Sequence, residues 1–395
     1  MIQLFNINTH IIDTSKFSHL LHDNNVIEFE KKIANYVGAK YACSVNSATN
    51  AIFLSLLEKK PNYMTRMEVK LPSMIPPVVA NAVLTSGFMN TIEFVDDVDW
   101  VGHSYVLHEF KDYKIVDSAQ KIEPNQFKQE CNPEDLMIFS FYPTKPLGGS
   151  DGGMIVTDDY EKYKWFKEAV LNGMTFADNN WERTISFPGY KMYMNSIQAQ
   201  ILLNNFKYLN KKMRVLKSLV NTYNKELGYE NSSKHLYRIE VLDNQKFIEN
   251  MKRVGIVCGI HYPALHLNPI YTKCNKLDCP KSKKLQDRTV SLPMNEKLSF
   301  LEVEYIVDKV KENITSPINE YTLQIGAFGK QSNAEYQKKI LLDSGYSARI
   351  ERVNNNGILL YIVRVGYFTS YIDAEKKQDN IYSRLAINSI IIKNE

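Results

Sequence analysis

Lys145 stands between an aromatic-rich segment and a glycine-rich loop, in the stretch FYPTKPLGGSDGG (141–153). A lysine in this setting can be a cation that holds a phosphate, or a nucleophilic amine that forms an imine with a carbonyl carbon. A P-loop places its glycines before the lysine and a serine or threonine directly after it. Here the glycines follow Lys145 and Pro146 comes next, so the order of residues excludes a P-loop. A solvated surface lysine is the remaining alternative to the nucleophile.

Two further polar residues follow predicted strands. Asp117 comes directly after the apolar run YKIV, and Ser140 lies near the end of the run LMIFSF. Ligands bind beyond the carboxyl ends of the strands in an open α/β sheet, so we expect both side chains at one site. A carboxylate there can keep a ring nitrogen protonated, and a hydroxyl can bind a phosphate.

The stretch NSAT (46–49) adds an anion site, because it opens a predicted helix whose first N–H groups have no partner within the helix. An anion cradle, a carboxylate for a ring nitrogen and an imine-forming lysine together match what pyridoxal phosphate requires. The sequence therefore favours Lys145 as a nucleophilic amine over a surface lysine.

Alternating strands and helices must position these residues. The stretch FEKKIANYV (29–37) places apolar residues on one helical stripe and ends before Gly38, a frequent helix terminator. A short apolar strand, KYACSV, leads into NSAT and the next helix. From Asn195, one long amphipathic helix is predicted to reach about Leu227. This alternation predicts a doubly wound α/β core with a smaller α+β lobe after the long helix.

An internal repeat follows residues 314–320, where serine and proline interrupt the alternation. QIGAFGKQSNAE (324–335) and RVGYFTSYIDAE (364–375) align without a gap at a spacing of 40 residues. Each copy is predicted to form an apolar strand, a Gly-x-Phe turn and a helix. Because only two copies exist, they fit a pseudo-symmetric domain of about 75 residues better than a solenoid.

Composition and charge limit the function classes. A net charge of +4 over 395 residues gives no reason to expect a nucleic-acid or membrane surface. The first residues lack the features of a signal peptide, and no apolar run is long enough for a transmembrane helix. Five scattered cysteines favour reduced thiols and a cytoplasmic location. Cys274 and Cys279 have no second pair at zinc spacing, so we expect no metal site.

The segments IVDSAQ (115–120) and FSFYPTKPLGGSDGGMIVTDD (139–159) resemble the DegT/DnrJ/EryC1/StrS family of sugar aminotransferases. The resemblance continues through GYKMYMNSIQAQI, KHLYRIEV, GIVCGIHYPALHLNPIY and VSLPMNE, and covers roughly residues 1–315. It implies a homodimer and the type I fold of pyridoxal-phosphate-dependent transferases, with a mostly parallel sheet in the large domain. The expected large domain spans residues 1–205 and the small domain residues 206–315.

The same resemblance implies roles for site residues. Lys145 would form the imine with pyridoxal 5'-phosphate, Asp117 would pair with the pyridine nitrogen, and Gln120 would contact the region of the ring hydroxyl. The freed amine of Lys145 would move protons during transamination, which requires it to be unprotonated near neutral pH. The expected phosphate ligands are the Ser140 side chain and the helix start at Ala48 and Thr49.

The activity that the resemblance implies is transfer of an amino group from glutamate or glutamine to a keto-sugar carried on a nucleotide, in surface-polysaccharide or amino-sugar biosynthesis. A related subgroup of dehydratases carries histidine in place of the lysine, so Lys145 favours transamination. A different class of function also stays open, namely a decayed aminotransferase fold that acts as a binding protein. The joint retention of Lys145, Asp117, Gln120 and Ser140 argues against decay.

Four features depart from the family pattern or stay ambiguous. PSMIPP (72–77) offers Ile75–Pro77 where the family stacks an aromatic ring on the cofactor. Lys191 replaces a frequent asparagine that reaches the phosphate of the neighbouring subunit. The stretch 95–116 is shorter than usual, which leaves the substrate class open. His261 either faces the substrate or is hydrogen-bonded within the protein.

Residues 320–395 resemble a SPOR domain, a ferredoxin-like α+β module that binds peptidoglycan glycan strands. The matching segments are YTLQIGAF, NAEYQKKILLDSGYSARI and LYIVRVGYFTSYIDAE. An antiparallel sheet with two helices on one face leaves its other face free for a ligand. The two alternatives are glycan binding and a fused interaction or dimer-stabilising domain that no longer meets the cell wall.

Overall fold

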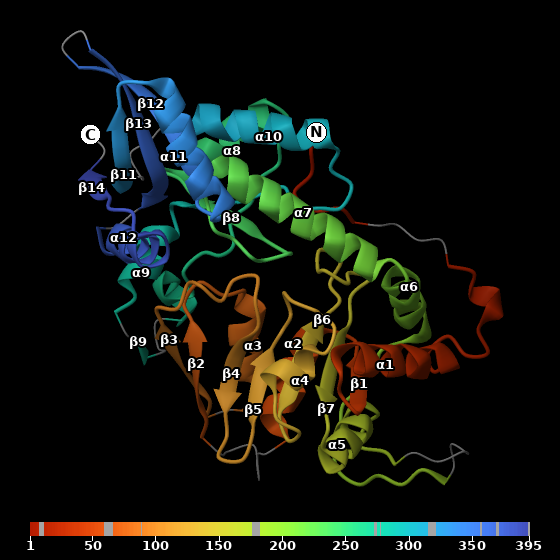
Figure 1. Ribbon diagram of the computed structural model, residues 1–395. Helices are drawn as coiled ribbons and strands as arrows, with labels where there is room; N and C mark the ends of the chain where they lie inside the picture. Colours follow the sequence, from red (N-terminus) through yellow and green to blue (C-terminus); the bar gives the residue numbers. More distant parts are fainter. Residues whose placement is uncertain are drawn as a thin grey trace.

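The computed structural model describes residues 1–7, 12–58, 66–87, 89–175, 182–271, 275–276, 278–314, 321–355, 358–368 and 371–393. Figure 1 shows three parts in chain order: a sheet region, a helical lobe around the long green helix α7 (Leu209–Leu227), and a C-terminal lobe in blue. The interruption predicted at 314–320 falls almost wholly outside the described residues, and so does Cys274.

The central sheet has five strands with mixed directions. Their order across the sheet is β1 (Tyr41–Val45), β7 (Gly153–Thr157), β6 (Leu136–Ser140), β5 (Lys114–Asp117) and β4 (Tyr105–Glu109). Strands β1, β5 and β6 run in one direction, whereas β7 and β4 run in the other. A separate parallel sheet contains β2 (Glu68–Pro72), β3 (Thr91–Val95) and β9 (Asn275–Lys276). The predicted α/β class is confirmed, with less parallel pairing than expected.

Helices cover both faces of the central sheet. They are α1 (Asn24–Val37), α2 (Ala48–Leu57), α3 (Pro77–Thr85), α4 (Gln126–Glu130), α5 (Tyr160–Val170) and α6 (Ser196–Phe206). Alternate residues of β6 contribute to two separate cores, because Phe139 packs with Phe29 of α1 and Ile138 with Leu54 of α2. Burial on both faces explains the continuous apolar runs that predicted these strands. Gly38 ends α1 in the left-handed conformation, as expected.

Strand β4 runs against β5 because only residues 110–113 connect them. A parallel connection needs about a dozen residues or more, so a link this short imposes a hairpin. The register pairs Tyr105, the first residue of β4, with Asp117, the last residue of β5. The shortened stretch noted in the sequence therefore brings the beginning of β4, and not its end, to the carboxyl edge of the sheet.

The single long helix predicted from Asn195 to Leu227 is wrong, since α6 and α7 are separate helices. Asn195 caps α6 in a capping box, and the N–H of Tyr208 closes a turn on the carbonyl of Asn205 at 3.0 Å. The apolar face of α6 joins the core of the large domain, whereas most of the apolar face of α7 joins the core of the following lobe. The turn between the helices lets each one serve its own core.

The lobe around α7 has a two-stranded antiparallel sheet of β8 (Tyr237–Glu240) and β10 (Thr289–Leu292). Helices α7, α8 (Asn244–Arg253) and α10 (Phe300–Asn313) share a core with one face of this sheet. The remaining short helices are η1 (Thr14–Lys16), η3 (Leu265–Leu267), η4 (Pro269–Tyr271) and α9 (Pro280–Leu285). Within the described residues, no helix has the length and apolar character needed to cross a membrane.

The C-terminal lobe repeats one β-α-β unit. Its elements are β11 (Tyr321–Phe328), α11 (Gln331–Asp343), β12 (Ala348–Asn355), β13 (Ile358–Phe368), α12 (Tyr371–Leu385) and β14 (Ile390–Lys393). The strands form an antiparallel sheet in the order β12-β13-β11-β14, and both helices contribute to a single core with it. Ala334 and Ala374, which match in the repeat, are both fully buried in that core.

The Gly-x-Phe turns predicted for the repeat are wrong, because both motifs lie inside strands. A Cβ added to Gly326 would meet the ring of Phe328 at 2.8 Å, and one added to Gly366 would meet the ring of Phe368 at 2.5 Å. Each phenylalanine therefore folds back over the glycine two residues earlier. The strand continues because the glycine leaves room for the ring.

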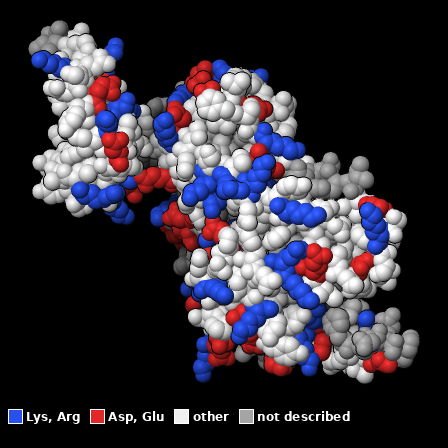
Figure 2. All heavy atoms as spheres, turned by 45° about the vertical axis from the view of Figure 1, so that its right-hand side comes forward, with Lys and Arg blue, Asp and Glu red and all other residues white. Residues whose placement is uncertain are grey.

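The C-terminal lobe contacts the end of α7. Lys377 of α12 forms an ion pair with Glu230, and the ring of Tyr367 approaches Gly228, which ends α7. Figure 2 shows this lobe standing away from the rest of the molecule, with basic and acidic side chains interspersed on the visible face.

A buried ion pair ties α1 to α5 beneath strand β1. Both carboxylate oxygens of Glu30 accept hydrogen bonds from Lys167 Nζ at 2.9 Å. Glu30 Oε1 also accepts from the backbone N–H and the hydroxyl of Ser44 at 2.8 Å. The pair is nearly sealed from solvent, since the Glu30 side chain is only 6% exposed.

We expect Lys167→Met to lower the free energy of unfolding by about 3–5 kcal/mol, because Glu30 would keep an uncompensated charge inside the protein. Urea unfolding followed by tryptophan fluorescence measures this. Arg253→Gln is the control, since it breaks an exposed pair with Glu249 and should cost only about 0.5 kcal/mol. Equal effects of the two changes would contradict the prediction.

Candidate active site

The polar residues singled out in the sequence meet at the carboxyl edge of the central sheet. Strands β1, β5 and β6 all end there, at Val45, Asp117 and Ser140. The register aligns Ser140 with Gly153 and Gly153 with Val45, so the end of β6 and the start of α2 lie on either side of β7. The topology thus brings these segments to one place.

The start of α2 offers free backbone donors. The Ser47 side chain accepts from the N–H of Asn50, whereas the N–H groups of Ala48 and Thr49 have no partner among the described residues. A Cβ at Gly153 would lie 2.7 Å from the nitrogen of Ala48, so only glycine permits this approach of β7 to the helix. The result is a pair of backbone donors without a partner among the described residues, beside Ser140.

Lys145 lies in a loop that returns tightly from β6 into β7, as expected from its glycines. The N–H of Lys145 bonds to the carbonyl of Tyr142, and the N–H of Gly149 bonds to the carbonyl of Phe141, both at 2.9 Å. A Cβ at Gly148 would meet the carbonyl oxygen of Pro143 at 2.2 Å, so the turn requires glycine there. Burial lowers the pKa of the Lys145 amine to about 8.

Asp117 is a buried carboxylate held by three groups. Burial raises its pKa, and the N–H of Ala119 (2.8 Å), the hydroxyl of Tyr105 (2.9 Å) and the charge of Lys145 lower it. Conversely, the charge of Asp117 raises the pKa of Lys145 against the larger effect of burial. Asp117 and Lys145 therefore lie close enough to act on each other.

Gln120 is oriented by both domains. Its Oε1 accepts the N–H of Gly102 at 2.6 Å, and its Nε2 donates to the hydroxyl of Tyr262 at 2.8 Å. The ring of Tyr262 lies parallel to that of Trp100, with centroids 6.2 Å apart. Loop 96–104 and the segment after His261 thus form one wall next to Asp117.

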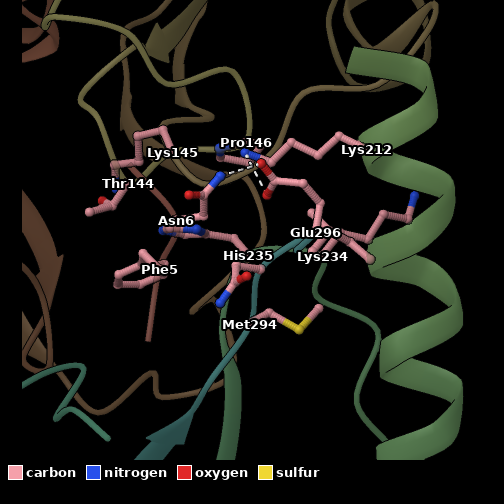
Figure 3. A pocket seen from close by; sticks show the side chains of 12 residues that line it. Phe5, Asn6, Thr144, Lys145, Pro146, Lys212, Lys234, His235, Met294 and Glu296 are labelled. Atoms are coloured by element: carbon pink, nitrogen blue, oxygen red, sulfur yellow. Dashed lines mark hydrogen bonds and ion pairs between the residues drawn. The ribbon is translucent and has the colours of Figure 1, made fainter. Parts of the chain in front are cut away.

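Figure 3 shows a hollow that Lys145 lines together with the N-terminal segment, α7 and the turn after β10. Glu296 accepts from Asn6 Nδ2 at 2.8 Å and pairs with Lys212 of α7 at 3.6 Å. His235 also lines this hollow, and burial lowers its pKa well below 6.5, so its ring is neutral at neutral pH. The amine of Lys145 therefore faces side chains from both domains.

The residues that depart from the family pattern, or whose role the sequence left open, lie in different environments. Ile75 is fully buried in the main core, whereas Pro77, which begins α3, is exposed, so of the two only Ile75 packs inside the protein. Lys191 is exposed near His22, whose pKa its charge lowers. His261 Nδ1 lies 2.9 Å from Ser291 Oγ, which makes it a hydrogen-bonded histidine. Cys279, of the pair considered for zinc, is buried against the carbonyl of Phe94.

Sequence reasoning missed the residues that hold Asp117 and Gln120. Tyr105 and Gly102 belong to the short stretch 95–116, and Tyr262 stands next to His261 in HYP. The signal available was DWVGHSY (99–105), an aromatic and polar cluster directly before a strand. This cluster lies at the site only because β4 runs antiparallel to β5, and hydrophobic periodicity does not reveal the direction of a strand.

Comparison with known proteins decides the family. Residues 6–100 and 113–311 match the profile of the DegT/DnrJ/EryC1/StrS aminotransferase family, and residues 318–393 match the SPOR domain. The chain belongs to this aminotransferase family. The match is interrupted at residues 101–112, the stretch that contains β4 and its turn.

Among its relatives is the spore coat polysaccharide biosynthesis protein SpsC of Bacillus subtilis, which is 24% identical over 76% of this chain and 92% of its own length. A UDP-4-amino-4,6-dideoxy-N-acetyl-beta-L-altrosamine transaminase of Campylobacter jejuni is also 24% identical, over 72% of this chain and 88% of its own. The solved structure of Helicobacter pylori PseC, an aminotransferase involved in the biosynthesis of pseudoaminic acid, has a TM-score of 0.65. It is 18% identical, and the alignment covers 79% of this chain and 99% of PseC, which shows the shared fold.

The residues of the site fit pyridoxal phosphate. A buried carboxylate at Asp117 suits a protonated ring nitrogen, because burial of one charge demands an opposite charge nearby. The free N–H groups of Ala48 and Thr49 suit a phosphate beside Ser140. Lys145 Nζ has no hydrogen-bond acceptor among the described residues, which suits an amine that bonds to a carbonyl carbon.

We expect Tyr105→Phe to weaken retention of pyridoxal phosphate about tenfold, since a hydrogen bond to a charged group contributes about 1.5–3 kcal/mol. The change removes the donor to Asp117 Oδ2 and raises the pKa of that carboxyl group. Fluorescence titration of the apo-protein with the cofactor measures the affinity. Tyr113→Phe is the matched control, because the Tyr113 hydroxyl bonds to Glu58 away from the site.

The amine of Lys145 should react with pyridoxal in a pH-dependent way. Because its pKa is lowered to about 8, the rate of imine formation in the apo-protein should rise as the pH passes about 8 and level off above it. Asp117→Asn removes the charge that raises this pKa, so its midpoint should lie lower. Stopped-flow absorbance measures both curves, and a midpoint near 10.5, the ordinary value, would contradict the assignment.

Proposed function

We propose that this protein is a pyridoxal-phosphate-dependent transaminase that moves an amino group from glutamate or glutamine to a keto-sugar carried on a nucleotide. One observation carries the proposal: the buried amine of Lys145, with a pKa near 8, lies within the electrostatic reach of the buried carboxylate of Asp117. A fold kept only as a scaffold has no use for this costly pair of buried charges.

The side chains would divide the work as follows. Asp117 would keep the ring nitrogen of the cofactor protonated, Gln120 would contact its hydroxyl region, and Ser140 with the start of α2 would bind its phosphate. When bound, pyridoxal phosphate supplies an electron sink. Lys145 would move a proton at the substrate carbon, which its lowered pKa supports because far more of the amine is unprotonated near neutral pH than in an ordinary lysine.

The names of relatives support the substrate class. The Campylobacter relative is named for a UDP-linked amino sugar, and a Pseudomonas aeruginosa relative is named UDP-2-acetamido-2-deoxy-3-oxo-D-glucuronate aminotransferase. The second is 22% identical over 71% of this chain. Both names describe aminotransfer on a nucleotide-linked sugar, which is the reaction proposed here.

The proposal includes a homodimer in the cytoplasm, with a large domain at 1–205, a small domain at 206–315 and a SPOR domain at 320–395. Among the described cysteines, Cys43, Cys131 and Cys258 are free thiols, which is consistent with a reducing compartment. Whether Lys191 reaches the phosphate of the neighbouring subunit belongs to the same proposal, and its exposure leaves it available for that contact.

The SPOR domain would contact peptidoglycan glycan through the sheet face that its helices leave open. Ala348 and Ile350 of β12 pack toward the helices, so Arg349 and Glu351 lie on the opposite face. The guanidinium of Arg349 stacks on the Tyr367 ring at 3.8 Å, and Glu351 pairs with Arg364 at 2.7 Å. Arginine and aromatic side chains of this kind suit hydroxyl groups and sugar rings.

The decisive experiment is absorbance of the purified protein after addition of pyridoxal phosphate. An imine with Lys145 should give a band near the edge of the visible range that disappears with borohydride and is missing in Lys145→Ala. The exposed Lys70 provides the control, since Lys70→Ala should keep the band. If wild-type protein gives no band, the protein is a binding protein with a decayed site.

A further inference from the structure

Arg238 is a half-buried cation at the seam between the two aminotransferase domains. It lies on β8, where its neighbours Tyr237 and Ile239 point into the core of the small lobe. Side chains alternate along a strand, so Arg238 points the other way, toward the large domain. There its Nη2 donates to the carbonyl of Val98 at 2.7 Å.

This guanidinium is poorly paired. Arginine carries five N–H donors, and the bond to Val98 is the only one that Arg238 makes within the described part of the chain. No carboxylate there forms an ion pair with it, although the charge of Asp99 acts on it from a distance. Arg238 is only partly buried, so part of its side chain remains accessible to a ligand.

The groups around Arg238 belong to the wall of the candidate active site. Ser291 is its direct partner across the β8–β10 ladder, and Ser291 Oγ lies 2.9 Å from His261 Nδ1. Tyr262 follows His261 and bonds to Gln120. Burial lowers the pKa of His261 to about 4, and the charges of Lys145 and Arg238 contribute to this lowering, so both cations lie close enough to act on this histidine.

A second donor in the same wall also lacks a partner. Trp100 is 7% exposed, and its indole Nε1 is buried with no hydrogen-bond acceptor among the described residues. Trp100 stacks against Tyr262 and lies two residues from Val98, the acceptor of Arg238. An unpaired buried donor is costly, so the Trp100 indole N–H and the incompletely paired Arg238 in one wall indicate that an acceptor belongs there.

We propose that Arg238 binds an oxyanion of a substrate, a carboxylate or a phosphate, at the seam between loop 96–104 and the β8–β10 sheet. The inference rests on the proposed function and deepens it, because it assigns a substrate-binding residue in that site. Planar guanidinium groups bind carboxylates and phosphates through two parallel hydrogen bonds, which lysine cannot reproduce. Two substrates offer such a group: the carboxylates of the amino-acid donor and the diphosphate of the nucleotide.

Calorimetric titration of the full-length protein with glutarate and with UDP tests this. Glutarate carries the two carboxylates of the donor without its amine, and UDP carries the diphosphate without a sugar, so neither probe reacts. Arg238→Gln should weaken binding of one probe about tenfold or more, as expected for a lost charge-assisted pair. A loss for glutarate alone identifies the donor carboxylate, and a loss for UDP alone identifies the phosphate.

Arg238→Lys should also lose most of that affinity, although it keeps the charge, whereas Arg253→Gln on the exposed face of α8 should bind both probes like wild type. Circular dichroism confirms that each variant is folded. Equal binding of both probes to wild type and Arg238→Gln, or no binding of either probe to wild type, would overturn the proposal. The titration measures binding and not a reaction. If the protein binds glutarate through Arg238 but shows no imine band with pyridoxal phosphate, the proposed transamination is refuted and the role of Arg238 is not.

Discussion

The burial of the Asp117 carboxylate is the constraint that the candidate site depends on. A charge taken out of water at the end of β5 destabilises the fold unless donors and an opposite charge surround it. Ala119, Tyr105 and Lys145 supply them from three different segments of the chain. The loop after β6, the hairpin of β4 and the turn after β5 therefore have to meet at one point, and this requirement fixes how the edge of the sheet is built.

The same requirement links the two domains. Gln120 accepts from the loop before β4 and donates to Tyr262, and Glu123 pairs with Lys234 from the lobe around α7. Leu236 of that lobe is buried in the core of the large domain. A shift of one domain relative to the other would therefore change the contacts that orient Gln120.

Much of this arrangement could be predicted from sequence because it is local. The apolar runs before Asp117 and Ser140, the helix after NSAT and the tight return after Lys145 each carry their own signal. The break between α6 and α7 could not be predicted, since no proline or glycine marks it and only the position of two separate cores explains it. The direction of β4 could not be predicted either. Strand direction depends on the length of the connection to the neighbouring strand, whereas hydrophobic periodicity reports only which face of a strand is buried.

The hairpin of β4 and β5 also determines where this protein can diversify. Its turn, 110–113, lies at the edge of the sheet opposite Asp117, so insertions there would leave Tyr105 in place. Loop 96–104 is tethered at both ends and carries Trp100 and Gly102 into the wall beside Gln120. The turn 110–113 can therefore accept insertions without moving the site. A change in loop 96–104, by contrast, alters the side chains that line the wall beside Gln120.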